Sequence, residues 1–209
     1  MSEVARQALV DAARALHAGG MNIGTAGNLS LREGDGMLIT PSALPYPLMQ
    51  AEDIVAVDKD GQAQGRHRPS SEWRIHFEVY RRHAEAGAVV HTHSSHATAL
   101  ACLERGIPAF HYEVALAGGP DIRCADYATF GGEALARNVA AALEGRRACL
   151  VAHHGVVCLG RDLDAALELA QKVEQLAQMY LLCLQHGEPP LLDDAEMARV
   201  AEQYRGYFA

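Results

Sequence analysis

An apolar run that ends in two histidines, Ala86-Gly-Ala-Val-Val-His-Thr-His93, constrains the fold more than any other stretch of this chain. Its small and β-branched residues predict the end of a buried strand. Side chains alternate along a strand, so His91 and His93 are expected on one face, with Thr92 pointing away. Neutral imidazole is the commonest nitrogen ligand of zinc. The pair therefore indicates half of a transition-metal site, although His-x-His alone also fits ordinary core or surface histidines.

Two further features strengthen the metal interpretation. His153-His154 follows the apolar stretch 148–152, which predicts another buried strand, so one of these rings could converge with the first pair. Glu72 follows two serines at the predicted start of a helix, where it could serve as an oxygen ligand or a base. A carboxylate in the first turn of a helix is also common because it interacts favourably with the helix dipole. A catalytic zinc site needs three or four protein ligands, and the sequence supplies enough candidates.

The order of the predicted elements indicates an α/β chain. Helices are predicted over 5–16, 70–82 with Ser71 as the N-cap, from 95 onward, 134–143, 163–184 and 193–204. Strands are predicted over 28–32, 36–40, 54–57, up to 93, 148–152 and 156–159. Hairpin signals are mixed with βα units, so we expect a mixed sheet. The 209 residues are 49% hydrophobic, which is enough for one large core, and we expect 1–209 to form a single domain.

Composition and charge exclude several classes of function. The formal net charge is −8 and no basic cluster is long enough to follow a nucleic-acid backbone, so we expect neither nucleic acid nor an anionic membrane as a partner. No segment has the length of a membrane span or the pattern of a signal peptide. The five cysteines are scattered and lack a Cys-x-x-Cys pair. They are expected to be buried, reduced thiols of a cytoplasmic protein.

Seven motifs, in order along the chain, resemble those of the class II aldolase/adducin family. They are Thr25-Ala-Gly-Asn-Leu-Ser30, Asp35-Gly-Met-Leu-Ile-Thr-Pro-Ser42, Pro69-Ser-Ser-Glu-Trp73, Val90-His-Thr-His-Ser94, His111-Tyr112, Tyr127-Ala-Thr-Phe-Gly131 and His153-His-Gly155. Within the family, the sequence is most similar to members that cleave L-fuculose 1-phosphate. The resemblance implies a three-layer α/β/α domain with a mixed, largely antiparallel central sheet. It also implies a homotetramer with four-fold cyclic symmetry and active sites between subunits.

The resemblance assigns roles to individual residues. One Zn²⁺ per chain would be held by Glu72, His91, His93 and His154, with His153 as a structural neighbour. The substrate phosphate would be held by Gly27, Asn28, Ser42, Ala43, Ser70 and Ser71. Glu72 would become the acid/base once substrate displaces it from the metal. Tyr112 would act at the aldehyde end, and Tyr207 would reach in from a mobile C-terminal tail.

The implied reaction is zinc-dependent cleavage of a ketose 1-phosphate to dihydroxyacetone phosphate and an aldehyde. The substrate would be L-fuculose 1-phosphate or a related deoxypentulose phosphate. A Lewis-acid metal stabilises the enediolate that this cleavage leaves, so no Schiff-base lysine is needed. Lys59 and Lys172 are the only lysines, which argues against that alternative. The small residues assigned to the phosphate offer backbone N–H groups and hydroxyls, both of which suit an anion.

Three alternatives belong to the same family. An epimerase of L-ribulose 5-phosphate or a dehydratase of a methylthioribulose phosphate would have the same fold. Glu72, where the epimerase usually has aspartate, and the His111-Tyr112 pair favour the aldolase. A non-catalytic scaffold is disfavoured by the intact set of histidines. One departure is Ala43, where the family often has glycine: either the loop avoids positive φ or the phosphate contact shifts.

Overall fold

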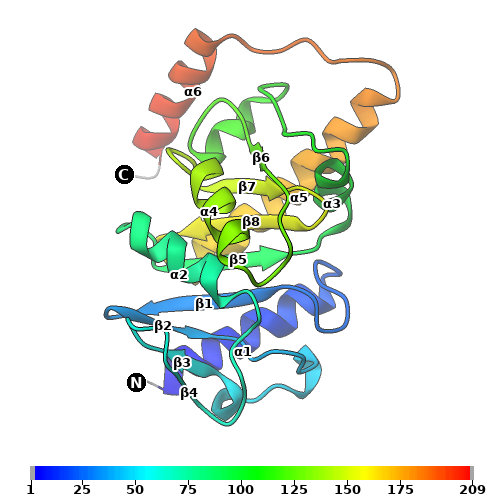
Figure 1. Cartoon of the computed structure of the whole chain (residues 1–209). Helices are drawn as coiled ribbons and strands as arrows, with labels where there is room; N and C mark the ends of the chain where they lie inside the picture. Colours follow the sequence, from blue (N-terminus) through cyan, green and yellow to red (C-terminus); the bar gives the residue numbers. More distant parts are fainter. Residues whose placement is uncertain (1–2, 208–209) are drawn as a thin grey trace.

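One eight-stranded sheet runs through residues 3–207, the part of the chain that the computed structural model describes. Its strands are β1 (Asn28–Glu33), β2 (Gly36–Ile39), β3 (Val55–Val57), β4 (Ala63–Gln64), β5 (Ala88–Thr92), β6 (Arg123–Ala125), β7 (Ala148–Val151) and β8 (Gly155–Gly160). They lie in the order β4-β3-β2-β1-β5-β8-β7-β6 (Figure 1). Only β6 and β7 pair in parallel, and all other neighbours are antiparallel. The expected mixed, largely antiparallel sheet is confirmed.

Helices cover both faces of this sheet. The α-helices are α1 (Glu3–Ala18), α2 (Trp73–Arg82), α3 (Ser95–Cys102), α4 (Glu133–Ala142), α5 (Leu163–Leu184) and α6 (Asp194–Tyr207). The 3₁₀ helices are η1 (Tyr46–Leu48), η2 (Ala51–Asp53) and η3 (Tyr112–Ala117). α1, α3 and α5 pack on one face, and α2 and α4 pack on the other (Figure 1). This is the three-layer α/β/α arrangement that the resemblance implied.

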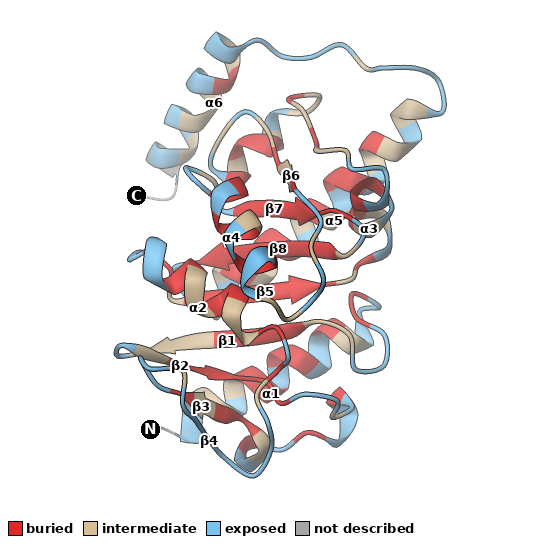
Figure 2. Ribbon diagram, in the orientation of Figure 1, coloured by how far each residue is buried: buried red, intermediate tan, exposed pale blue. Residues whose placement is uncertain are grey.

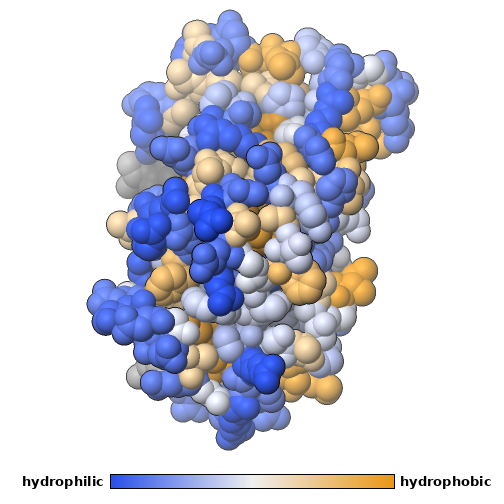
Figure 3. Space-filling model, viewed as in Figure 1, coloured by the Kyte–Doolittle hydropathy of each residue, from blue (hydrophilic) through white to orange (hydrophobic). Residues whose placement is uncertain are grey.

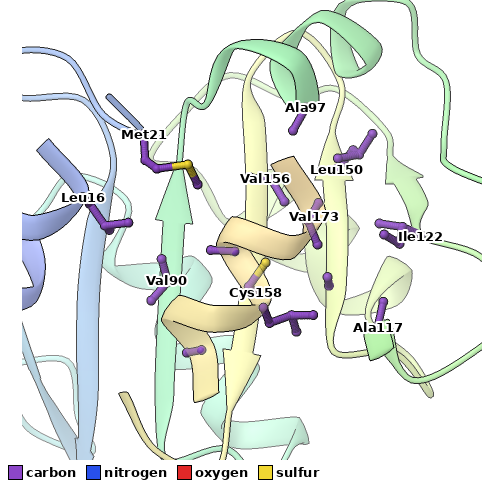
Figure 4. Packing of buried hydrophobic residues seen from close by; sticks show 14 of the residues in the cluster. Leu16, Met21, Val90, Ala97, Ala117, Ile122, Leu150, Val156, Cys158 and Val173 are labelled. Atoms are coloured by element: carbon purple, nitrogen blue, oxygen red, sulfur yellow. The ribbon is translucent and has the colours of Figure 1, made fainter. Parts of the chain in front are cut away.

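Each face of the sheet has its own hydrophobic cluster, so the central strands are buried on both sides (Figure 2). Alternation divides β5 between the two clusters: Val90 belongs to the α1/α3/α5 side and Val89 to the α2/α4 side. On the first side, Val173 of α5 lies among Val156, Leu150 and other sheet residues (Figure 4). All five residues of β5 are buried. Packing on both faces fixes this strand, and with it the position of His91 at its end.

The structure corrects three local expectations. Glu72, not Ser71, is the N-cap of α2, and its side chain does not cap the helix because it turns into the protein. Cys102 is exposed, whereas a buried thiol was expected; it ends a short helix whose apolar face is supplied by other residues. The last helix extends to Tyr207, three residues beyond the predicted end at Tyr204.

Most large apolar side chains of the described residues are buried. On the face shown in Figure 3, hydrophilic residues dominate and apolar residues occur in separate patches. Within residues 3–207, no helix combines the length and apolar character that a membrane span requires.

Candidate metal centre and active site

Four candidate metal ligands converge from three segments of the chain. His91 is the last residue but one of β5 and His93 follows the strand, His154 lies in the β7–β8 turn, and Glu72 is the N-cap residue of α2. One ligand atom from each lies within 4.8 Å of the others. His91 Nε2 is 3.0 Å from His93 Nε2 and 3.1 Å from Glu72 Oε2, and His154 Nε2 is 2.9 Å from Glu72 Oε1. The structure thus brings together the four residues that the sequence marked for metal.

Sheet register and one left-handed residue explain this convergence. His91 is opposite Asn28 of β1 and Val157 of β8, so it sits at the centre of the sheet. His153 has φ 54°, and this left-handed conformation turns the chain sharply between β7 and β8. As a result, His154 enters the cluster, whereas the half-exposed His153 pairs with Glu104 at 3.0 Å. The two adjacent histidines therefore have different surroundings.

The hydrogen-bond chemistry of the cluster fits a cation. His91 Nδ1 donates to the Val156 carbonyl at 2.9 Å, so Nε2 is the ring nitrogen that faces the cluster. Glu72 Oε1 is buried and lies 2.9 Å from His154 Nε2. Imidazole nitrogens and carboxylate oxygens thus face one another, and these are the atoms that bind a metal ion. Three nitrogens and one oxygen are also a ligand set that suits zinc.

The electrostatics of the cluster keep His93 neutral and Glu72 charged. Burial, together with the charges of His91 and His154, lowers the pKa of His93 to about 4. Burial alone would raise the pKa of Glu72, but His91 and His154 outweigh it and hold that pKa well below its usual value. Neutral imidazole and ionised carboxylate are the protonation states in which these groups bind metals.

A cavity of about 340 Å³ opens beside the cluster. Its walls include His93, His154 and Glu72, and all six residues expected to hold phosphate: Gly27, Asn28, Ser42, Ala43, Ser70 and Ser71. Gly27 has φ 76°, and a Cβ there would lie 2.4 Å from the Asn22 side chain, so only glycine fits. Ala43 has φ 60°, so the loop does adopt the left-handed conformation that alanine disfavours. Chain segments far apart in sequence therefore form one pocket next to the candidate metal ligands.

The structure does not bring Tyr112 into this cavity. Tyr112 begins η3, is 48% exposed and is absent from the cavity wall. Its ring stacks on Tyr204 of α6, with centroids 6.4 Å apart and planes at 15°. Tyr207 lies in α6, but its side chain is outside the described residues.

Sequence reasoning missed several residues of the site. Tyr127 and Phe130 line the cavity, yet they were noted only as part of a motif. His76 is fully buried on α2 and bonds to Asn28, one of the cavity residues. Its position four residues after Glu72 was the available signal, because residues i and i+4 share a helix face.

Comparisons with known proteins agree with this geometry. A sequence profile described as the class II aldolase and adducin N-terminal domain matches residues 7–181. The chain belongs to this family. A 5-methylthioribulose-1-phosphate/5-deoxyribulose-1-phosphate aldolase of Rhodospirillum rubrum is 54% identical over 202 residues, covering 97% of this chain and 91% of that protein. An L-fuculose phosphate aldolase of Escherichia coli is 46% identical over 207 residues, covering 99% and 96%. The solved structure of an L-fuculose 1-phosphate aldolase matches with a TM-score of 0.95 and 39% identity over 98% of both chains.

These relatives are named as aldolases and are matched over nearly their full lengths. The chain is accordingly an enzyme, a lyase of the class II aldolase type, and not a scaffold. Its candidate metal ligands and phosphate loops line one cavity, so the site is compatible with a metal and a phosphorylated sugar.

Proposed function

We propose that this enzyme is a zinc-dependent aldolase that cleaves a ketose 1-phosphate to dihydroxyacetone phosphate and an aldehyde. The observation that supports this most strongly is the convergence of Glu72, His91, His93 and His154 beside a cavity lined by short hydroxyls and glycine. A metal there would supply Lewis-acid stabilisation of the negative charge that develops on the substrate oxygens. The two loops that carry Gly27 and Ser42, together with Ser70, would hold the phosphate through backbone N–H groups and hydroxyls.

The proposed cleavage breaks the bond between C3 and C4 of the ketose. The electron pair stays with C3, while the C4 hydroxyl loses its proton and becomes the aldehyde. Glu72, once displaced by substrate, would take up a proton from solvent and deliver it to C3, which completes dihydroxyacetone phosphate, while the proton from the C4 hydroxyl returns to solvent. Tyr112 would accept or return the proton at the C4 oxygen. Tyr112 lies outside the cavity of its own chain, so it would reach a neighbouring subunit's site.

The sequence identities to two relatives favour one class of substrate over another. The Rhodospirillum rubrum aldolase, named for 5-methylthioribulose 1-phosphate and 5-deoxyribulose 1-phosphate, is 54% identical, compared with 46% for the Escherichia coli L-fuculose phosphate aldolase. We therefore place 5-deoxypentulose 1-phosphates and their methylthio analogues ahead of L-fuculose 1-phosphate. Tyr127 and Phe130 give the cavity an apolar wall that would suit an aldehyde end without a hydroxyl.

We also propose a cytoplasmic homotetramer with active sites between subunits. The separation of Tyr112 from the cavity supports shared sites, because one chain alone does not bring the proposed groups together. The five cysteines are free, which agrees with a reducing compartment.

A substrate panel with metal analysis tests this function. The purified enzyme would be offered 5-deoxyribulose 1-phosphate, 5-methylthioribulose 1-phosphate and L-fuculose 1-phosphate, with dihydroxyacetone phosphate measured by coupled reduction. We expect about one zinc per chain, and loss of activity on chelation that zinc or cobalt restores. Epimerised or dehydrated products without dihydroxyacetone phosphate would indicate the alternative family activities. Full activity without a divalent metal would refute the mechanism.

A further inference from the structure

A buried chain of polar side chains leads away from Glu72 between β1 and α2. Asn28 Nδ2 lies 3.0 Å from Glu72 Oε2, and Asn28 Oδ1 contacts His76 Nε2. His76 Nδ1 is 2.7 Å from Ser30 Oγ, which is 2.7 Å from the Tyr80 hydroxyl. All five residues are buried. The polar chain packs against the α2/α4 cluster, so each of its groups depends on the next for a hydrogen bond.

The spacing of residues along a helix and along a strand explains how this polar chain forms. Glu72, His76 and Tyr80 are spaced by four residues on α2, which advances about 6 Å per step. Asn28 and Ser30 are spaced by two residues on β1, which advances about 6.6 Å per step. The nearly equal steps let polar residues from the two elements alternate along the line where α2 crosses β1.

The carboxylate at one end gives this chain of hydrogen bonds a direction. An ionised carboxylate only accepts, so Asn28 must direct its NH₂ group at Glu72 and its oxygen at His76. His76 must then donate from Nε2, which leaves Nδ1 as an acceptor for the Ser30 hydroxyl. In the reverse direction, Asn28 would direct its oxygen at the Glu72 carboxylate, and two acceptors would repel each other.

If His76 were doubly protonated, its Nδ1 could no longer accept a hydrogen bond from Ser30, and the order of donors and acceptors along the polar chain would be lost. Burial, with the nearby charge of His91, lowers the pKa of His76 to about 3. Neutral His76 with its proton on Nε2 is therefore the state that satisfies every group in the polar chain.

We propose that His76 and Ser30 are positioning residues that lock the Asn28 amide, so that it holds Glu72 Oε2 beside His91 and leaves Oε1 directed at His154. Neither residue touches the cavity, and both act through Asn28. The link to turnover rests on the proposed function, whereas the hydrogen-bond direction and its effect on metal affinity do not. Partners of metal ligands commonly change metal affinity or activity by about 10- to 100-fold.

The direction can be measured in the metal-free protein without any assay of activity. Long-range ¹⁵N–¹H correlation of labelled imidazoles identifies which ring nitrogen of each histidine carries the proton, and His76→Gln assigns the His76 signals. We expect His76 at neutral pH to carry its proton on Nε2 alone. A proton on Nδ1 would overturn the proposal.

Two matched pairs of variants test the positioning role. Ser30→Ala removes the hydroxyl that holds His76 Nδ1, so zinc affinity should fall about 10-fold and kcat should fall more than KM rises. Tyr80→Phe also removes a buried hydroxyl, but it leaves the Ser30 bond to His76, so both quantities should stay within about twofold. His76→Gln places an N–H near the position of Nε2 and should retain more zinc affinity than His76→Leu. Equal effects within both pairs would show that the polar chain is only structural.

The readouts separate this inference from the proposed function. If no ketose phosphate is cleaved but Ser30→Ala still weakens zinc binding selectively, the proposed function fails and the positioning role stands. If the aldolase is active and Ser30→Ala matches Tyr80→Phe in zinc affinity and kcat, the positioning role fails alone.

Discussion

Glu72 is the residue whose chemical role is most directly testable. It is buried, ionised and in contact with His91 and His154, so it can serve both as a ligand and as a proton carrier. Glu72→Gln keeps the size and hydrogen bonding but removes the acid/base. We expect kcat to fall by about 10²-fold or more. Zinc content should fall less, because three imidazoles remain.

The matched control for Glu72→Gln lies on the same helix. Glu78 is paired with Arg81 and Arg82 on the solvent side of α2 and is outside the cavity. Glu78→Gln should leave kcat unchanged in the same steady-state assay. If Glu72→Gln turned over like the wild type, Glu72 would have no part in proton transfer and would be only a carboxylate at the start of a helix.

His76 should make stability depend on pH in a predictable direction. Burial and the nearby charge of His91 lower its pKa to about 3, whereas the unfolded value is about 6.5. Protons therefore favour the unfolded chain: the stabilisation is complete above pH 6.5 and is lost as the pH falls toward 3. Between pH 6.5 and 5, this loss amounts to about 2 kcal/mol in the free energy of unfolding.

Denaturant titrations of metal-free protein at several pH values measure this effect. His76→Gln lacks the titrating group, so its stability should fall less steeply than that of the wild type over the same range. The other histidines are common to both proteins and cancel in the difference. Parallel stability curves would contradict a neutral, buried His76.

At the residue level, the sequence identified the candidate metal ligands but not the hydrogen bonds that hold them in place. His91, His93, His154 and Glu72 could be identified because each follows or begins a recognisable element. The hydrogen bonds from Asn28 to Glu72 and His76 depend on how α2 crosses β1, which no local pattern encodes. The exposed position of Tyr112 likewise depends on how distant segments pack.

At the scale of helices and strands, the long elements with a clear apolar pattern could be predicted, and the very short ones could not. The helix over Leu163–Leu184 was predicted at its observed boundaries, because apolar residues repeat at helical spacing. β4 and β6, with two and three residues, were missed. β6 pairs with β7, more than twenty residues later, so its stability comes from a long-range partner and not from its own sequence.

The loop that carries Ala43 stores backbone strain beside the cavity. Ala43 has φ 60°, a conformation that costs an L-residue about 1–2 kcal/mol. Ala43→Gly relieves this cost but adds freedom to the unfolded chain, so a net stabilisation of about 0.5–1 kcal/mol is expected. Chemical denaturation measures the change.

Ala26 provides the comparison for Ala43. It lines the same cavity, and its φ is not positive. Ala26→Gly should therefore destabilise the protein by about 0.5–1 kcal/mol, because glycine adds only unfolded-state freedom. Two changes of the same sign would show that φ at residue 43 is not the cause.

At the scale of the whole molecule, α6 packs on η3 through its described side chains. Tyr204 of α6 stacks on Tyr112, so α6 supports the segment that would enter a neighbouring site. A chain ending before Tyr204 loses this support. We expect kcat to fall markedly while zinc content stays near wild type, because all candidate ligands lie upstream. Equal kcat values for the truncated and full-length chains would exclude a role for the tail.

A shared active site makes a quantitative prediction for mixed tetramers. Light scattering should give a mass near four times 22.5 kDa. If Glu72 acts in one subunit's cavity and Tyr112 comes from its neighbour, then Glu72→Gln and Tyr112→Phe subunits carry complementary defects. Random assembly of equal amounts would pair two intact partners at about one quarter of the sites. Co-expressed hybrids, purified through two different tags, should therefore regain well over the activity of either variant alone. A monomer, or hybrids no more active than the average of the two parents, would place Tyr112 outside the catalytic site.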